Sequence, residues 1–460
     1  MQAVSVPFGF GSGADGPGGD GDPAPFFREL EKLMSWQGGP VNWDLAAQLA
    51  QRAVAADDPP VTAEATAAVA DSMRLADVWL DAATPLPSGV VRTEAWTRRR
   101  WLEATLPQWR TLCDPVAARV SEAMTATLSS GMSALGEGSA ELPAELAGAL
   151  PPGMDVSSLF AAGGPMLGMV RSVGGMMFGA QVGQAVGALA TGISASTEVG
   201  LPLGPAGTAA LLPAGVASFG AGLELPEDEV RLFLALREAA HHRLFGHVPW
   251  LRAHLTALVA DYAAGIAIDP DAIAAAVQGI NPADPSSMQD AMGSGVFGGQ
   301  TTPAQEAALG RLETALALVE GWVDTVVAAA AADRLPSAGA LREAVRRNRA
   351  TGGPTEQTFA TLVGLELRPR RLREAAALWV ALTEARGAEG RDAVWASPDL
   401  LPSGGDLDDP AAFVGAVGGS GGVTGAGGAG DLADPIAAIE ALGDAPAPRE
   451  DPPGDEPPVA

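Results

Sequence analysis

Residues 226–254 most strongly limit how this chain can fold. Three acids follow Pro226, as the positive end of a helix dipole favours. Apolar residues then recur at helical spacing from Val230 onward, so we expect one face of this helix to be buried. The protein has four histidines, and all of them lie in this stretch: His241, His242, His247 and His254. A partly buried helix that carries every histidine is therefore the first candidate for a functional site.

The string Arg237-Glu238-Ala239-Ala240-His241 is one residue away from a zinc hydrolase motif. In H-E-x-x-H, two imidazoles one helical turn apart bind the metal, and the glutamate acts as general base toward the metal-bound water. Glu238 occupies the position of the base and His241 that of the second histidine, whereas Arg237 stands where the first histidine belongs. A guanidinium keeps its proton and has no lone pair to give to zinc. The string therefore predicts an altered metal site.

The charge balance restricts the partners of the chain. It contains 55 acidic and 28 basic residues, which give a net charge of -27. This charge repels nucleic acid and anionic membrane surfaces. The expected partner or substrate is a peptide or protein, and the sequence does not fix the oligomeric state.

The cysteine content and the N-terminus bear on the compartment. The single cysteine, Cys113, excludes an intramolecular disulfide and a cysteine-based zinc site within one chain. We expect its side chain to be a small buried hydrophobic group. The first residues have neither the basic segment nor the continuous apolar segment of a signal peptide, so the cytoplasm is the expected compartment.

Helical patterning across residues 25–403 predicts one mainly α-helical domain with at most a few short strands. Residues 1–24 are rich in glycine, proline and aspartate and are predicted to be a disordered leader. Residues 130–155 are predicted to be an internal loop. Residues 404–460 carry eleven acids against one arginine and are predicted to be a disordered acidic tail.

The 26 residues between Arg171 and Glu198 carry no charge, a length that can span a bilayer. Glycines recur every four residues along this stretch and form a ridge that lets another helix approach closely. They are Gly175, Gly179, Gly183 and Gly187. Because Gln181 and Gln184 interrupt its middle, we favour a buried core helix over a membrane span. The ridge can pack within the chain or against a second copy.

Two further segments bear on the site. Residues around Ala209–Val216 are expected to form a short extended segment beside the histidine-bearing helix. A long apolar helix later in the chain carries Glu320 and Asp324, four residues apart. One class of zinc hydrolases takes a third ligand from such an E-x-x-x-D pair, with the aspartate supporting the neighbouring ligands. Glu320 is therefore a candidate ligand and Asp324 its candidate support.

Several strings across roughly residues 28–410 resemble a known family. They are GGPVNWDLA, MFGAQVGQAVGALA, GLPLGP, PEDEVRLFLALREAAHHRLFGHVPWLRAHL, ALVEGWVD, LVGLELRPRRLREAAALW, and RDAVW followed by SPDLLP. They look like the actinobacterial zincin-like proteins that are assigned as hydrolases and labelled zinc-dependent metalloproteases, with relatives associated with deazaflavin-coenzyme biosynthesis. The resemblance implies a zincin-like multi-helix domain and zinc held by two histidines and an acid. It implies Glu238 as base, His241 as a ligand and Glu320 as the third ligand.

In one interpretation the protein is an active hydrolase. Zinc is then held by His241, Glu320 and a substitute such as His242 or His247, and Glu238 activates water for attack on an amide carbonyl. The geometry opposes His242, because successive residues point about 100 degrees apart around a helix.

In a second interpretation the Arg237 guanidinium occupies the place of the metal and pairs with Glu238 and Glu320. The protein is then a metal-free pseudoenzyme that acts as a binding or scaffolding module. In a third, the stretch is a buried helix of an unrelated all-α protein. The resemblance favours the first interpretation and the chemistry of arginine the second, so the sequence alone leaves enzymatic activity open.

Overall fold

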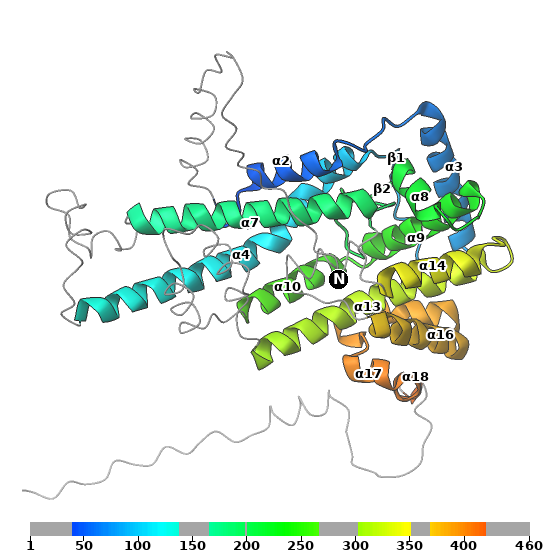
Figure 1. Ribbon diagram of the computed structural model, residues 1–460. Helices are drawn as coiled ribbons and strands as arrows, with labels where there is room; N and C mark the ends of the chain where they lie inside the picture. Colours follow the sequence, from blue (N-terminus) through cyan, green and yellow to red (C-terminus); the bar gives the residue numbers. More distant parts are fainter. Residues whose placement is uncertain (1–38, 138–164, 198–199, 266–301, 351–368, 420–460) are drawn as a thin grey trace, which may run out of the picture. The chain divides into compact units, whose positions relative to one another are not determined.

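The computed structural model describes residues 39–137, 165–197, 200–265, 302–350 and 369–419. These residues are mainly helical with two short strands, which confirms the predicted fold class (Figure 1). The described helices up to Asp392 are α2 (Trp43–Val54), α3 (Ala63–Leu80), α4 (Arg98–Glu137), α7 (Pro165–Gly192), α8 (Pro213–Gly220), α9 (Glu227–His247), α10 (Leu251–Ala264), α13 (Pro303–Ala331), α14 (Ala338–Ala350) and α16 (Pro369–Asp392). The described residues up to Val414 form one compact unit. The predicted leader, residues 1–24, lies outside the described residues.

Local capping chemistry fixes where two helices begin. The Asn42 side chain accepts a hydrogen bond from the backbone N–H of Leu45 at the start of α2. The Thr62 hydroxyl accepts one from the N–H of Ala65 at the start of α3. Each bond satisfies a backbone donor that has no partner within its own helix.

The glycine ridge of α7 packs within the chain, against α2. A side chain at Gly183 would lie 2.6 Å from the backbone oxygen of Ala46, and one at Gly187 would lie 2.8 Å from the Ala53 methyl group. The Asn42 N–H also donates to the Gly175 carbonyl over 2.8 Å. The uncharged stretch therefore lets two helices of one unit approach closely. In the part of the chain that the structure describes, α13 alone is long and apolar enough to cross a membrane, and 78% of its apolar window is buried inside the protein.

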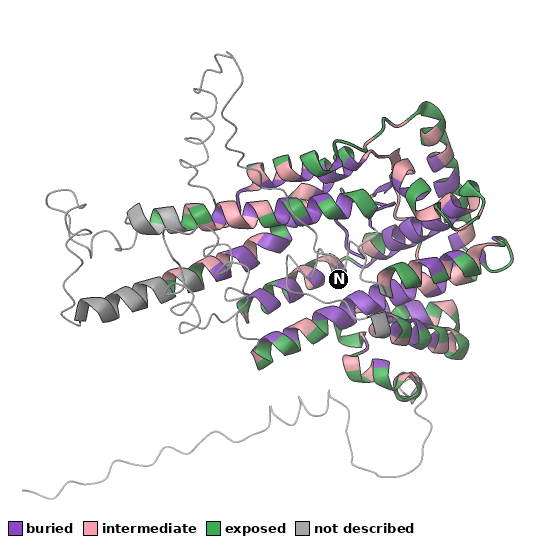
Figure 2. Ribbon diagram, in the orientation of Figure 1, coloured by how far each residue is buried: buried purple, intermediate pink, exposed green. Residues whose placement is uncertain are grey.

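Helices α9 and α13 lie at the centre of the unit and contact each other (Figure 2). Every residue from Leu232 to Leu244 is buried, so the expectation of a single buried face for α9 is wrong. The reason is that α3, α8, α13, α14 and the second strand all contact α9. The polar side chains of α9 consequently need partners inside the protein.

The strands β1 (Arg92–Ala95) and β2 (Thr208–Leu211) pair in parallel, with Arg92 opposite Thr208 and Ala95 opposite Leu211. The sequence predicted an extended segment around Ala209–Val216 beside the histidine-bearing helix. Its first part is confirmed because β2 contacts α9, whereas its second part belongs to α8.

Two predicted boundaries need correction. Helix α4 continues to Glu137, so the loop predicted for residues 130–155 starts too early, and its remainder lies outside the described residues. The tail predicted from residue 404 begins with helices α17 (Gly404–Asp408) and α18 (Pro410–Gly419). A capping box between Ser403 and Asp406 starts α17, and Leu407 is buried. Composition alone misses these local contacts.

Candidate functional site

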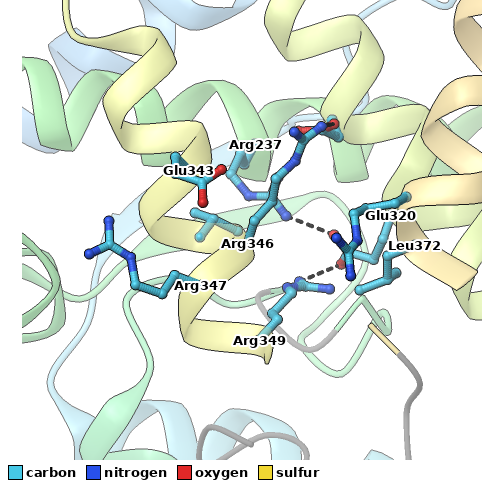
Figure 3. Close-up of a pocket in the computed structure, with 10 residues that line it drawn as sticks. Arg237, Glu320, Glu343, Arg346, Arg347, Arg349 and Leu372 are labelled. Carbon is cyan, nitrogen blue, oxygen red and sulfur yellow. Dashed lines mark hydrogen bonds and ion pairs between the residues drawn. The ribbon is translucent and has the colours of Figure 1, made fainter. Parts of the chain in front are cut away.

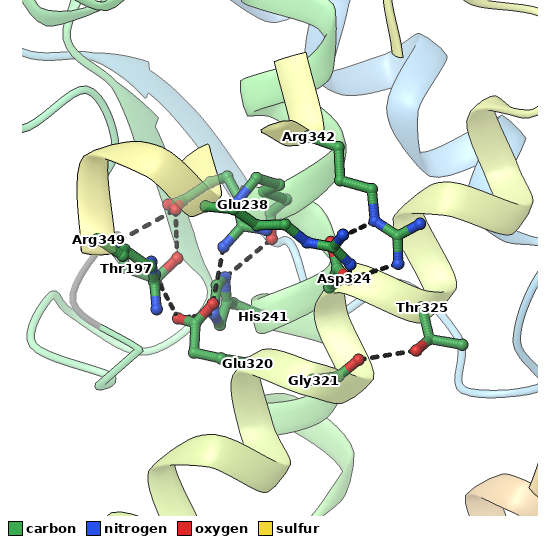
Figure 4. Close-up of polar contacts among 11 residues, drawn as sticks. Thr197, Glu238, His241, Glu320, Gly321, Asp324, Thr325, Arg342 and Arg349 are labelled. Atoms are coloured by element: carbon green, nitrogen blue, oxygen red, sulfur yellow. Dashed lines mark hydrogen bonds and ion pairs between the residues drawn. The ribbon is translucent and has the colours of Figure 1, made fainter. Parts of the chain in front are cut away.

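The central turns of α9 send two pairs of side chains in different directions. Figure 4 shows His241, from the first pair, beside the Glu320 carboxylate. Arg237 and His241, four residues apart, both contact Glu320 of α13. Glu238 and His242, also four residues apart, contact each other beside residues 196–197 and β2. The two pairs differ by one residue, which rotates them by about 100 degrees around the helix.

The Glu320 carboxylate is the centre of the first cluster. Arg237 Nη2 lies 2.7 Å from its Oε2, and His241 Nε2 lies 3.1 Å from its Oε1. Arg349 Nη2, from α14, lies 3.0 Å from the same Oε1. Burial by itself raises the pKa of Glu320, but the charges of Arg349, His241 and Arg237 bring that pKa well below its ordinary value. The carboxylate is therefore held ionised inside the protein.

His241 is fully engaged through both ring nitrogens. Its Nδ1 lies 2.9 Å from the backbone oxygen of Arg237, and its Nε2 faces Glu320. Both neighbours are oxygen acceptors, so both contacts are hydrogen bonds when the ring carries two protons.

Gly200 completes this cluster from the loop before β2. Its φ is +72°, and a Cβ atom at this position would lie 2.7 Å from Oε1 of Glu320. A glycine is therefore required here, both by the backbone conformation and by the close approach to the carboxylate.

Asp324 lies one turn after Glu320 but serves α14 instead of the proposed ligands. Its carboxylate accepts from Arg342 Nε at 2.8 Å and from Arg346 Nη2 at 2.9 Å. Burial raises its pKa, and the hydrogen bond and charge of Arg342, together with the charges of Arg346 and Arg237, lower it below its ordinary value overall. Asp324 therefore attaches α14 to α13.

The carboxylate of Glu238, the expected general base, is occupied by hydrogen bonds within the protein. It accepts from the hydroxyls of Ser196 and Thr197, from the Thr197 N–H at 3.1 Å and from the Ala210 N–H at 3.0 Å. His242 Nε2 lies 3.3 Å from the same carboxylate. Burial raises the pKa of Glu238, but His242 and the two hydroxyls bring it down to about 2. The predicted pairing of Glu238 with Arg237 is therefore wrong, because Glu238 instead connects α9 to β2 and to residues 196–197.

The remaining histidines lie away from Glu320. His242 faces Glu238 and so points away from His241, and only this second feature was predicted from the rotation around the helix. His247 Nε2 lies 3.3 Å from the backbone oxygen of Ser88. His254 packs edge-on against Trp250, with ring centroids 5.6 Å apart. None of the three joins the Glu320 cluster as a substitute ligand.

The groups around Glu320 do not fit a zinc ion. Two guanidiniums and one imidazole surround the carboxylate, and a guanidinium has no lone pair for a metal. A structural zinc site needs four protein donors and a catalytic site three. Within the described ranges, no three His, Cys, Asp or Glu side chains are grouped closely enough to hold a metal ion.

A pocket of about 360 Å³ opens beside this cluster (Figure 3). Its lining comes from α9, α13, α14 and α16. The residues are Arg237, Glu320, Asp324, Glu343, Val345, Arg346, Arg347, Arg349, Leu372 and Arg373. Figure 3 shows Arg237 and Arg349 each joined to the Glu320 carboxylate.

Sequence reasoning missed several residues of the site. Nothing local in the sequence indicated that Arg349 of α14 reaches Glu320 or that Arg342 and Arg346 hold Asp324. The string GLPLGP contains Gly200, whose role depends on a contact with a residue 120 positions later.

Comparison with known proteins gives two matches. A family model described as a zincin-like metallopeptidase matches residues 41–414. The chain is also similar to the crystal structure of a proposed hydrolase with a novel fold from Chloroflexus aurantiacus. The two chains are 20% identical with a TM-score of 0.55, and the similarity covers 82% of this chain and 99% of that one, which supports a shared fold. None of the curated proteins compared with the chain matches it.

Proposed function

The chain belongs to the zincin-like metallopeptidase family, and we propose that it is a metal-free variant of this hydrolase fold that binds a ligand or partner. The observation that carries the proposal is the contact of Arg237 with Glu320. The guanidinium stands at the position of the first motif histidine and lies 2.7 Å from the expected acidic ligand. It supplies a positive charge where the family motif expects zinc.

Burial supports this substitution. The side chains of Arg237 and Glu320 are 11% and 7% exposed. A buried carboxylate must be paired, and a guanidinium can do so with directed hydrogen bonds. Arg349 adds a second cation at the other carboxylate oxygen.

The state of Glu238 supports the same proposal. A general base must reach the water from which it takes a proton. The Glu238 carboxylate is instead surrounded by Ser196, Thr197, Ala210 and His242, and its pKa of about 2 makes it a weak base. We infer that its role in this chain is structural.

Zinc-dependent peptide hydrolysis is the second candidate function. It is favoured by the distance of 3.1 Å between His241 Nε2 and Glu320, since both are zinc donor types at motif positions. It needs a third donor in the position that Arg237 occupies.

A zinc titration of the full-length protein separates the two candidates. By calorimetry, we expect the wild type to show no one-to-one zinc binding. Arg237→His restores the motif and places a third donor beside His241 and Glu320, so this variant should gain such binding. One-to-one zinc binding by the wild type that Glu320→Gln abolishes would favour the hydrolase instead.

A further inference from the structure

We propose that the pocket beside Glu320 binds a small organic anion, one that carries a phosphate or carboxylate group on an apolar body. The inference rests on the proposed metal-free function, because it treats the Arg237–Glu320 pair as a finished part of the wall. It goes beyond that function by assigning the chemical class of the ligand.

The charge of the lining favours an anionic ligand. Five arginines and three acids line the pocket, although the whole chain has a net charge of -27. A positive concavity in an acidic protein attracts anions and repels cations. The pocket therefore favours ligands that carry a negative charge.

Two of the three acids are already neutralised within the wall. Glu320 is paired with Arg237 and Arg349, and Asp324 with Arg342 and Arg346. Both carboxylates have lowered pKa values because of these cations. They therefore orient the guanidiniums without reversing the positive character of the pocket.

Two exposed arginines of the lining are the proposed contacts of the anionic group. Arg347 and Arg373 are exposed and line the pocket from α14 and α16. Arg373 has no ion-pair partner within the described ranges of the chain. Guanidinium groups recognise phosphate and carboxylate by paired, parallel hydrogen bonds. Arg347 and Arg373 lie on helices that contact each other, so we assign both to one anionic group of the ligand.

The size and the apolar part of the lining indicate the rest of the ligand. The volume of about 360 Å³ lies within the range of small-molecule sites, roughly 300–1,000 Å³. Val345 and Leu372 contribute apolar surface on the same two helices as the exposed arginines. An inorganic ion would leave this surface uncovered, whereas an anion on an apolar body covers it.

Isothermal titration calorimetry on the full-length protein at low salt tests the proposal with three probes. Octyl phosphate carries a phosphate group on an alkyl chain and octanoate carries a carboxylate group on one. Octanol carries an uncharged hydroxyl group instead. We expect at least one alkyl anion to bind at least tenfold more tightly than octanol. Binding of octyl phosphate alone identifies a phosphate site, and binding of octanoate alone a carboxylate site. Equal affinity for all three probes, or no binding of either anion, overturns the proposal.

Variants locate the binding. The double variant Arg347→Ala/Arg373→Ala should weaken binding of the alkyl anion at least tenfold, and Arg99→Ala, an exposed change on α4 outside the pocket, should leave it unchanged. If the double variant does not unfold cooperatively, Arg373→Ala alone carries the test. Unchanged affinity in the folded variant overturns the site. If the protein contains no zinc and binds neither anion, the proposed ligand class is wrong, whereas the proposed metal-free function still holds.

Discussion

The guanidinium of Arg237 lies 2.7 Å from the carboxylate of Glu320, although 83 positions separate the two residues in the chain. His241 and Arg349 contact the same carboxylate. Two helices at the centre of the fold are thus joined by a buried ionic cluster.

Arg237→Ala should strongly destabilise the protein. The change leaves the buried Glu320 with fewer cations, and the loss in free energy of unfolding should be on the order of 3 kcal/mol. Urea unfolding measures it. Glu320→Gln in the same background should then cost less than it does in the wild type, because one of the cations paired with Glu320 is already gone. A loss for Arg237→Ala no larger than that of the exposed control Arg99→Ala would contradict the account.

Glu238→Gln should also destabilise the fold. The amide nitrogen of glutamine would face groups that donate to the carboxylate, including the N–H groups of Thr197 and Ala210. The expected loss is about 1–3 kcal/mol in the free energy of unfolding. Glu103→Gln on the surface of α4 is the matched control. Unchanged stability for Glu238→Gln would indicate a carboxylate that faces solvent, as a catalytic base requires.

Acid should unfold the protein through its buried carboxylates. Glu238, Glu320 and Asp324 have pKa values below their ordinary ones in the folded state. Their contribution to stability is fully present above the unfolded-state pKa values, about 4, and is lost as the pH falls through the folded-state values. The Glu238 contribution, from a pKa of about 2, is on the order of 3 kcal/mol.

Unfolding experiments from pH 6 to pH 2 measure this dependence. The free energy of unfolding should fall steeply below about pH 4, and Glu238→Gln should flatten that slope. A slope that is unchanged in the variant would show that Glu238 is not held as an ion in the fold.

Some of this arrangement follows from the sequence and some does not. The caps at Asn42 and Thr62 were predictable because each depends on residues three positions away. The approach of Glu320 to His241 was expected from the motif spacing. The contacts of Glu238 with Ser196, Thr197 and Ala210 were not, because these residues lie 28 to 42 positions earlier in the chain and are brought to α9 only by folding. The contact of Arg349 with Glu320 was also not predictable, because folding alone brings α14 to this part of α13.

Gly200→Ala should disturb the cluster directly. The substitution strains a backbone with φ of +72° and places a methyl group against the Glu320 carboxylate. The expected loss is on the order of 2 kcal/mol in the free energy of unfolding. Gly204→Ala is the control, since its methyl group would make an ordinary contact of 3.5 Å with Trp96. Equal melting temperatures for the two variants would contradict the assigned role of Gly200.

The central claim is that Arg237 takes the place of a metal, and elemental mass spectrometry of the purified full-length protein tests it most directly. The zinc content is measured before and after dialysis against a chelator, together with the cooperativity of thermal unfolding. The account predicts a cooperatively folded protein with no stoichiometric zinc in either sample. Near one zinc per chain before dialysis, lost together with stability afterwards, would contradict it.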